Sequence, residues 1–263
     1  MKKNKDWAFS YDEFKEMVEW PLKDKISRAE QLILSELKDA DNPMVACSWG
    51  KDSMALLHLV RKFCKNVAVC FHNTKVQYPE TYKFRDKMLK KWDLYNQYYE
   101  TEPVMDFWEC AKRYGHPEFR SRDNKVKCCW KMKERPAIKF IKRNNIDVEF
   151  VGLQATESNM RRLSFLQYGE TLNSKKYNTR VIRPLMIWTD EDIWEYHKIN
   201  DIPYNPLYDE MERTGCMPCS GFKGWEKVMK NYNPGLYKVI KKQRKENNQE
   251  VNENFDKECF DGN

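Results

Sequence analysis

The alternation of apolar runs with charged, periodic segments predicts a series of strands and helices. Short apolar runs predict buried strands, and they fall at 43–48, 66–72, 94–100, 147–152 and 179–184. Segments with helical character fall between them, at 54–64, 83–92, 106–113 and 131–143. Strands and helices that alternate at this spacing predict a doubly wound, Rossmann-like sheet of five mainly parallel strands. Ligands of such sheets bind at the carboxyl ends of the strands.

Both ends of the chain show helical patterns without a strand. Residues 1–41 are predicted to form a helical lead-in packed on the sheet. Its apolar face is formed by Ile26, Ala29, Ile33 and Leu37. Residues 42–222 contain all the predicted strands and form the central domain. Residues 223–263 are predicted to form a basic helical C-terminal segment, with a polar, loose tail beyond Glu246.

The composition restricts the class of protein. The chain has 263 residues, of which 33% are charged and 14% aromatic, which is enough for a sizeable buried core. No run of 18 or more residues is apolar, and the first six residues lack an apolar signal core, so we expect a cytoplasmic protein without a membrane segment. The nine cysteines are expected to serve as metal ligands, catalytic thiols or core residues rather than as disulfides.

Residues 48–53, Ser-Trp-Gly-Lys-Asp-Ser, follow the first predicted strand and open a helix. A turn at a helix N-terminus leaves backbone N–H groups free and carries the positive end of the helix dipole, so it can bind an anion. Gly50 allows close approach of a phosphate, Ser48 and Ser53 offer hydroxyls, and Lys51 offers a charge. The spacing differs from the Walker pattern. An ordinary strand–helix turn is the simpler alternative.

This hexapeptide resembles the pyrophosphatase loop (PP-loop) of the adenine-nucleotide alpha-hydrolase superfamily. A second segment, 73–82, resembles the Asp-Thr-Gly…Pro-Glu-Thr segment of phosphoadenosine-phosphosulfate (PAPS) reductases, and the resemblance implies nucleotide contacts from Thr74 and Glu80. Asn73 and Lys75 depart from that pattern, which puts the ligand role of the missing aspartate in doubt.

A third segment, 151–162, resembles the Gly-x-Arg-x-x-Glu-Ser-x-x-Arg pattern of the same family, with Gln154 in place of the first arginine. The resemblance implies binding roles for four of its residues. They are Gly152, Glu157, Ser158 and Arg161. Arg161 would lie one turn inside a helix, where its guanidinium can fork onto a phosphate or a sulfate.

The longest match runs through 183–208 and ends at Gly-Cys-Met-Pro-Cys, 215–219. The matches together cover roughly residues 43–222 and resemble the PAPS reductase family. The resemblance implies a HUP-type doubly wound fold and makes 42–222 a nucleotide-binding domain with a metal site.

Four cysteines form two pairs, the adjacent Cys128 and Cys129 and the spaced Cys216 and Cys219. Two such pairs can share one metal centre. Adjacent cysteines suit tetrahedral zinc poorly, and the four positions resemble the [4Fe-4S] site of adenylyl-sulfate (APS) reductases. An iron–sulfur cluster is therefore the first hypothesis, with structural zinc or no metal as alternatives. Four further cysteines lie in strand or helix segments and are expected to be small core residues. They are Cys47, Cys64, Cys70 and Cys110.

Glu258-Cys259 resembles the start of the C-terminal Glu-Cys-Gly-Leu/Ile-His sequence whose cysteine is the nucleophile of sulfonucleotide reductases. Here Phe260 and Asp261 follow, without the histidine. An unmatched tail thiol is the alternative interpretation of Cys259.

Lys51 bears on the choice of reaction. Sulfonucleotides carry one phosphate joined to sulfate, and the related reductases commonly lack this lysine. Enzymes that split ATP into AMP and pyrophosphate keep Gly-Lys-Asp-Ser, because lysine can neutralise the outer phosphates. Lys51 and Asp52 therefore favour ATP, with Mg²⁺ on its phosphates.

Positive charge is concentrated at 112–143, where twelve Lys and Arg residues accompany only Glu118, Asp123 and Glu134. Such a patch predicts contacts with a polyanion such as a nucleic acid, and a solvated basic face is the alternative. Five more basic residues lie within 238–245, where the solvated face is the preferred interpretation.

The leading hypothesis is an iron–sulfur ATP pyrophosphatase that activates a nucleic-acid oxygen for sulfur transfer, as in DNA phosphorothioation or tRNA thiolation. Lys51, Asp52 and Arg161 would act at the phosphates, and a cysteine desulfurase would be a partner. The main alternative is an APS or PAPS reductase that releases sulfite, with Cys259 as nucleophile and a thioredoxin-like donor. A third is a nucleotide-sensing or nucleic-acid-binding module. A homodimer is compatible with each.

Overall fold

The computed structural model describes residues 7–117, 127–174, 179–222 and 224–246. These residues divide into two compact units. The first unit contains the sheet and is built from the described parts of 1–71, 83–100 and 138–206. The second is built from those of 72–82, 101–137 and 207–263. Each unit is described by itself.

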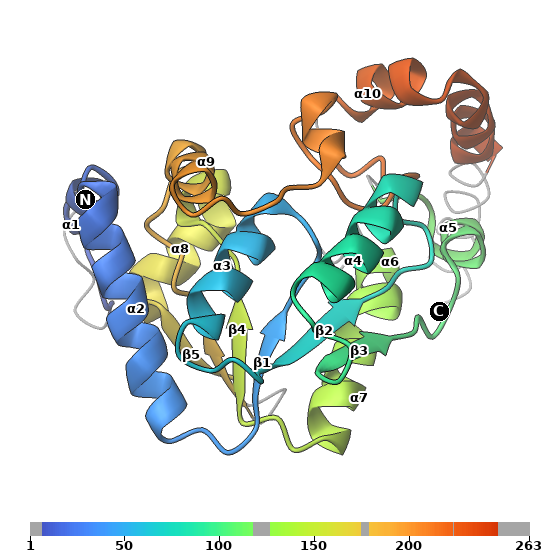
Figure 1. Ribbon diagram of the computed structural model, residues 1–263. Coiled ribbons are helices and arrows are strands. Elements are labelled where there is room, and N and C mark those ends of the chain that lie inside the picture. Colours follow the sequence, from blue (N-terminus) through green and yellow to red (C-terminus); the bar gives the residue numbers. More distant parts are fainter. Residues whose placement is uncertain (1–6, 118–126, 175–178, 223, 247–263) are drawn as a thin grey trace, which may run out of the picture. The chain divides into compact units, whose positions relative to one another are not determined.

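Within the described residues, the sheet has six strands in the order β3-β2-β1-β4-β6-β5 (Figure 1). Their bounds are β1 Pro43–Ala46, β2 Ala68–His72, β3 Tyr98–Thr101, β4 Val148–Val151, β5 Thr171–Ser174 and β6 Thr179–Ile182. Strand β1 pairs in parallel with both β2 and β4, and β4 pairs in parallel with β6. The doubly wound, mainly parallel sheet expected from the sequence is therefore confirmed.

The expected number of five strands is corrected to six by β5, which pairs with β6 in the antiparallel direction. The four residues of β5, Thr-Leu-Asn-Ser, include one apolar side chain and are only partly buried. An edge strand of this kind leaves no apolar run in the sequence.

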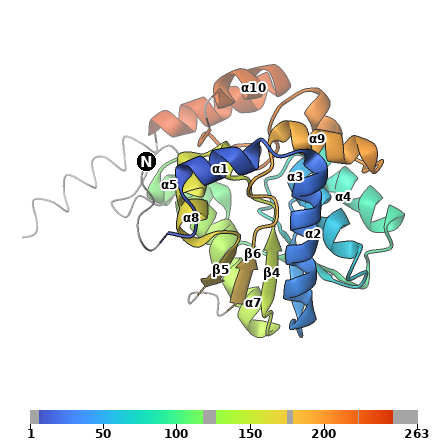
Figure 2. The same cartoon turned by 90° about the vertical axis from the view of Figure 1, so that its left-hand side faces the viewer.

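The strand order reverses between β1 and β4. The chain moves outward from β1 to β2 and β3, then returns to place β4 on the other side of β1. Helices α2 (Leu22–Lys38) and α3 (Lys51–Arg61) lie on one face of the sheet, and α7 (Arg135–Arg143) and α8 (Asn159–Tyr168) lie on the other (Figure 2). The loops that follow β1 and β4 therefore meet at the switch point, where doubly wound sheets bind ligands.

The predicted lead-in forms two helices, α1 (Tyr11–Val18) and α2, rather than one continuous helix. Trp20-Pro21 separates them, because proline ends or starts a helix and restricts the residue before it. Ala29 and Ile33 of α2 are fully buried, as the predicted apolar face requires. The first unit also contains α9 (Asp190–Ile199) and most of α4 (Pro79–Lys91).

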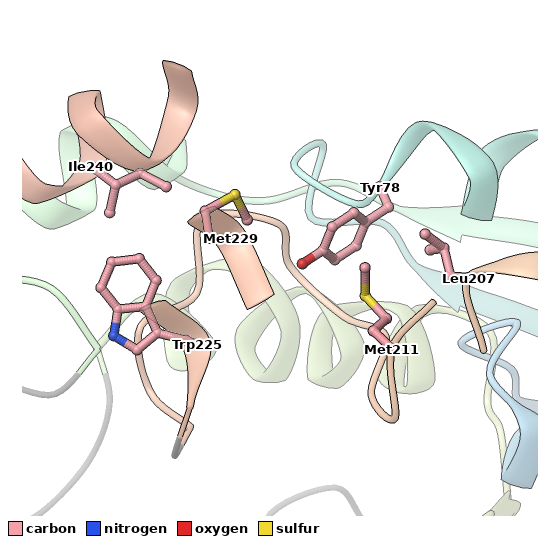
Figure 3. Close-up of a cluster of buried hydrophobic side chains, with 6 residues drawn as sticks. All are labelled: Tyr78, Leu207, Met211, Trp225, Met229 and Ile240. Atoms are coloured by element: carbon pink, nitrogen blue, oxygen red, sulfur yellow. The ribbon is translucent and has the colours of Figure 1, made fainter. Parts of the chain in front are cut away.

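The second unit consists of short helices around its own apolar cluster. Its helices are α5 (Phe107–Tyr114), α6 (Lys127–Cys129), a π-helical turn at Trp130–Glu134 and α10 (Trp225–Tyr232). Residues 234–246 are also helical. Figure 3 shows the buried cluster, which joins side chains from four separate segments. Its members are Tyr78, Leu207, Met211, Trp225, Met229 and Ile240.

Three of the four cysteines assigned to the core are buried, as expected: Cys47, Cys70 and Cys110. Burial raises the pKa of Cys47 to about 11. Cys64 is only half-buried, because it follows the end of α3. No helix in the described part of the chain is long and apolar enough to cross a membrane. The tail beyond Glu246 lies outside the described residues.

Candidate functional site

The loop at 48–53 connects the end of β1 to α3 in the first unit. Gly50 is the N-cap of α3 and supplies no side chain to cap it, so backbone N–H groups of the first turn remain available to an anion. The hydroxyl of Ser53 donates to the carbonyl oxygen of Gly50 at 3.0 Å and accepts from the N–H of Ser48 at 3.2 Å. Ser53 therefore closes the loop on itself.

Trp49 anchors this loop in the core. Its φ of 64° lies in the left-handed region, which bulky residues rarely adopt. The side chain is fully buried and packs against Phe71 and Tyr98, with ring centroids 6.5 and 5.9 Å away. A strained backbone that is fixed by packing is typical of functional loops.

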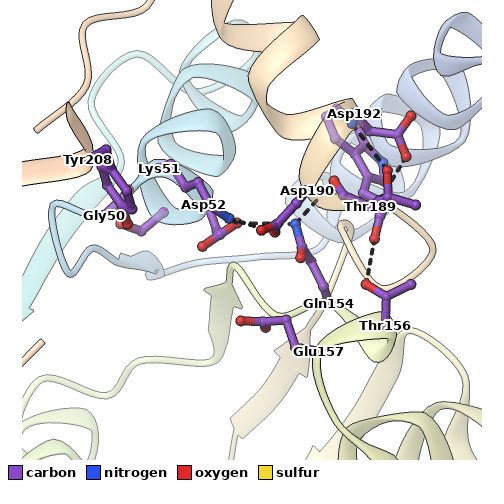
Figure 4. Close-up of polar contacts among 12 residues, drawn as sticks. Gly50, Lys51, Asp52, Gln154, Thr156, Glu157, Thr189, Asp190, Asp192 and Tyr208 are labelled. Atoms are coloured by element: carbon purple, nitrogen blue, oxygen red, sulfur yellow. Dashed lines mark hydrogen bonds and ion pairs between the residues drawn. The ribbon is translucent and has the colours of Figure 1, made fainter. Parts of the chain in front are cut away.

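Lys51 is buried and is held by two carboxylates. Its Nζ lies 2.9 Å from Asp52 Oδ1 and 2.7 Å from Asp190 Oδ1 (Figure 4). Burial lowers the pKa of the ammonium group, but the two carboxylates more than offset this effect and the net pKa is raised. Lys51 therefore stays charged, within a group whose formal charge is −1.

Gln154 stands after β4 where the family-like pattern has an arginine, and it is completely buried. Its Nε2 donates to Asp52 Oδ1 at 3.1 Å and to the carbonyl oxygen of Thr189 at 3.4 Å. Its Oε1 has no hydrogen-bond partner. A neutral amide donor here supports the Asp52 carboxylate, whereas an arginine would add a positive charge beside Lys51.

Gly152 brings the end of β4 against the first turn of α3. A Cβ atom at this position would lie 3.0 Å from the carbonyl oxygen of Asp52, so only glycine permits this approach. Ser158 caps α8 by accepting from the N–H of Arg161 at 3.3 Å. The Arg161 guanidinium is ion-paired with Glu157. These two side chains hold each other in this state of the protein.

In the second unit, the segment 73–82 is held by hydrogen bonds that Asn73 and Glu80 accept. Asn73 Oδ1 accepts from the N–H of Lys75 at 2.8 Å and from the hydroxyl of Tyr82 at 2.9 Å. Asparagine therefore builds a tight turn here, and Lys75 takes a positive φ of 61° within it. Glu80 accepts from the hydroxyl of Tyr232 at 2.9 Å.

The four paired cysteines line one cavity of about 140 Å³ in the second unit. They are Cys128, Cys129, Cys216 and Cys219. Thr74, Lys133 and Arg213 also line it. The thiol of Cys216 donates to the hydroxyl of Thr74 at 3.3 Å. Cys128 and Cys129 lie in α6, and the π-helical turn that follows contains Lys133; π-helical turns are frequent at functional sites.

The cavity favours a negative charge on one of its sulfur atoms, that of Cys129, whereas burial raises the pKa of Cys219. The hydrogen bond between the adjacent cysteines lowers the pKa of Cys129 and raises that of Cys128. The nearby thiols, Cys216 first, raise the pKa of Lys133. Within the described ranges, no three His, Cys, Asp or Glu side chains are grouped closely enough to hold a single metal ion. The cysteines surround a volume rather than a point.

A family model for the phosphoadenosine phosphosulfate reductase domain matches residues 42–222. The chain belongs to this family. An adenosine 5'-phosphosulfate reductase of Oceanobacillus iheyensis is 28% identical over 179 residues, which cover 66% of this chain and 70% of that protein. A phosphoadenosine 5'-phosphosulfate reductase of Xylella fastidiosa is 29% identical over 69% of this chain and 74% of that protein.

A solved structure supports the fold of this PAPS reductase family member. The PAPS reductase of Candida auris, in a phosphate complex, covers 80% of this chain and 96% of its own, with a TM-score of 0.56 and 18% identity. Likeness at this identity shows the fold alone.

The sequence predicts one nucleotide site and one metal site. The nucleotide site comprises residues from 48–53 together with Thr74, Glu80, Gly152, Glu157, Ser158 and Arg161. The structure places Thr74 and Glu80 in the second unit and the other residues of this set in the first, and it places the four paired cysteines together in the second unit. Trp49, Asp190 and Lys133 were not predicted from the sequence. Trp49 could have been noticed as a large residue where a tight turn favours small ones. Lys133 lies four residues after Cys129, on the same helical face. Asp190 left no local signal. Cys259 lies outside the described residues.

Proposed function

We propose that this member of the PAPS reductase family is an iron–sulfur enzyme that reduces a sulfonucleotide, APS or PAPS, to sulfite. The observation that carries the proposal is the single cavity lined by four cysteines, in a chain whose relatives are named adenosine phosphosulfate or phosphoadenosine phosphosulfate reductases. Membership of the family does not by itself identify the reaction, because proteins that resemble this family catalyse more than one kind of adenine-nucleotide chemistry.

The donor set of the cavity fits a [4Fe-4S] cluster. Such a cluster takes one thiolate on each iron, so its ligands must surround a volume. Cys128, Cys129, Cys216 and Cys219 do so, and Lys133 would offset the negative charge of a thiolate-bound cluster. When bound, the cluster would supply an iron centre whose charge and potential the surrounding residues tune. Thr74 would hold the Cys216 sulfur in place.

The nucleotide is proposed to bind at the 48–53 loop of the first unit. The N–H groups of the first turn of α3 would take a phosphate, and Lys51 would face the anionic group beyond it. Gly152 and Ser158 would shape the neighbouring loop. The nucleotide-binding roles that the family resemblance implies for Thr74 and Glu80, which belong to the second unit, stay predictions.

The proposed reaction has two steps, a nucleophilic attack by Cys259 and a reduction by a dithiol protein. The thiolate of Cys259 attacks the sulfur of the sulfonucleotide, an S–S bond forms and the S–O bond to the phosphate breaks. The nucleotide leaves as AMP from APS or as adenosine 3',5'-bisphosphate from PAPS. A dithiol protein of thioredoxin type then donates two electrons to that S–S bond. Sulfite leaves, the Cys259 thiol is restored and the donor becomes a disulfide.

A second candidate function is favoured by Lys51. A buried, charged lysine at the loop is suited to the outer phosphates of ATP. ATP with Mg²⁺ would adenylate an acceptor oxygen and release pyrophosphate, and a sulfur nucleophile supplied by a desulfurase would then displace AMP. The acceptor would be a nucleic acid, which the basic segment 112–143 would hold. On α7, Arg135, Lys139, Lys142 and Arg143 are exposed.

Product analysis under anaerobic conditions tests these functions. The purified chain is offered APS, PAPS or Mg-ATP separately, with reduced thioredoxin-like donor, and with or without nucleic acid. Sulfite is expected together with AMP from APS, or together with adenosine 3',5'-bisphosphate from PAPS, and these products should be lost in Cys259→Ser. AMP and pyrophosphate from ATP, raised by nucleic acid and unchanged in Cys259→Ser, would replace the reductase with the sulfur-transfer enzyme. Tight ATP binding with no product would refute both and favour a nucleotide-sensing module.

A further inference from the structure

Asp190 is an exposed residue that forms an ion pair with the buried Lys51. Its side chain is 58% exposed, whereas that of Lys51 is 6% exposed, and the two charged atoms lie 2.7 Å apart (Figure 4). The carboxylate therefore covers the ammonium group of Lys51 on the side of the solvent. An anionic ligand that approaches Lys51 from solvent meets this carboxylate, and like charges at contact distance repel.

The two carboxylates on Lys51 are not equally free to move. Asp52 is the neighbour of Lys51 on α3, and the buried Gln154 fixes it by donating to Oδ1 at 3.1 Å. Its side chain is 21% exposed. In the described part of the chain, the Asp190 carboxylate contacts Lys51 without a second buried donor, and it is open to water. Asp190 is therefore the carboxylate that can leave.

The start of α9 does not depend on the carboxylate of Asp190. Thr189 and Asp192 form the capping box of this helix. Lys25 of α2 forms a buried ion pair with Asp192, with its Nζ 2.6 Å from Asp192 Oδ2. Asp190 can consequently turn its side chain toward water while the first turn of α9 keeps its position.

We propose that Asp190 is a specificity-determining residue of the nucleotide loop. Without nucleotide, the Asp190 carboxylate pairs with the Lys51 ammonium group. When a nucleotide binds, the anionic group that follows its α-phosphate replaces the Asp190 carboxylate as the partner of Lys51. This group is the sulfate of a sulfonucleotide or the β-phosphate of ADP and ATP. The inference rests on the proposed function, since it requires that the loop binds an adenine nucleotide.

The exchange predicts a dependence on the length of the ligand. AMP ends at the α-phosphate, so it does not compete with Asp190 for Lys51. ADP and APS each carry one further anionic group that does. Removing the Asp190 charge should therefore strengthen the binding of ADP and APS and leave AMP unaffected.

Calorimetric binding of AMP, ADP and APS to the anaerobically purified full chain, without divalent cations, tests this. Asp190→Asn should tighten ADP and APS by about tenfold, because one unit charge at contact distance is worth on the order of 1 kcal/mol or more. AMP should change by less than about twofold. Glu191→Gln is the matched control, since it removes another exposed carboxylate from the first turn of α9; it should leave all three affinities unchanged.

If the wild type binds nucleotide, three results would overturn the role of Asp190 and leave the proposed function standing. Equal tightening of AMP would show a general field effect. Weaker binding of all three ligands would show that Asp190 only positions Lys51. Identical behaviour of Asp190→Asn and Glu191→Gln would remove the special role of Asp190. A wild-type chain that binds none of the three would refute the proposed function as well.

Discussion

The imidazole of His197 on α9 bridges two backbone carbonyl groups, and one of them belongs to Lys51. Its Nε2 lies 2.8 Å from the Lys51 carbonyl oxygen, and its Nδ1 lies 3.1 Å from that of Ile202. The ring is almost fully buried. A neutral imidazole has one N–H and donates a hydrogen bond to only one of these oxygens, whereas the protonated ring donates to both. His197 thus ties α9 to the first turn of α3.

Replacing His197 with Phe is expected to lower both stability and nucleotide affinity. An aromatic ring is kept, but at least one of the two buried carbonyl oxygens loses the donor that the imidazole supplies, which costs about 1–3 kcal/mol. Urea unfolding measures the first effect and calorimetry with ADP the second. Unchanged affinity in a destabilised variant would show that the contact supports the fold without shaping the loop.

The contrast between local and distant partners explains what the sequence could predict. The 48–53 loop and the Cys128-Cys129 pair are local patterns, so both could be read from the chain. The contact between Lys51 and Asp190 spans 139 positions and depends on how α9 packs against α3. Strand β5 was missed for another reason: its polar residues are stabilised by pairing with β6, and no apolar run marks them.

Gly152→Ala is expected to destabilise the protein by about 1–3 kcal/mol and to weaken nucleotide binding. The added Cβ would lie 3.0 Å from the Asp52 carbonyl oxygen and 3.2 Å from the Ser53 backbone nitrogen, so the backbone of the loop must shift. Thermal unfolding and ADP titration measure the effects.

Gly235→Ala is the matched control for this substitution. Gly235 lies in the helical segment 234–246, and a Cβ there would have its nearest neighbour at 3.5 Å. Alanine is the better helix former, so this variant should keep or gain stability. Equal behaviour of the two variants would contradict the steric argument for Gly152.

Stability should fall in mild acid because of His58. Burial first, and then the charges of Lys62, His197 and Arg61, lower its pKa from 6.5 to about 4. The unfolded chain therefore binds a proton more readily than the folded one, so the contribution of His58 is complete above pH 6.5 and is lost as the pH falls toward about 4. Urea midpoints across this range should decline less steeply in His58→Gln. Parallel curves for the two proteins would rule out His58 as the source.

The buried pair of Lys25 and Asp192 is expected to be sensitive to the loss of one partner. Their side chains are 2% and 12% exposed, and their charged atoms lie 2.6 Å apart. Lys25→Met leaves the carboxylate without its counter-ion, which should cost about 3–5 kcal/mol. The double variant with Asp192→Asn should recover part of the loss. The exposed pair of Lys15 and Asp12 gives the comparison, and Lys15→Met should change the stability far less than Lys25→Met.

The metal content of cysteine variants tests the cavity in the second unit without relying on activity. The anaerobically purified chain should contain iron and sulfide, with about four iron atoms per chain. Cys219→Ser removes one thiolate from the cavity wall and should lose most of the iron and the visible absorption of the cluster.

Cys64→Ser is the control for that experiment, because Cys64 is also half-buried and free but is not part of the cavity lining. It should retain the iron of the wild type. Zinc in place of iron would contradict the cluster while keeping a metal role for the four cysteines. Equal iron loss in both variants would mean that iron depends on folding in general rather than on the thiolates around the cavity. The two substitutions are alike in chemistry and differ in place, so a difference between them reports the ligand set directly.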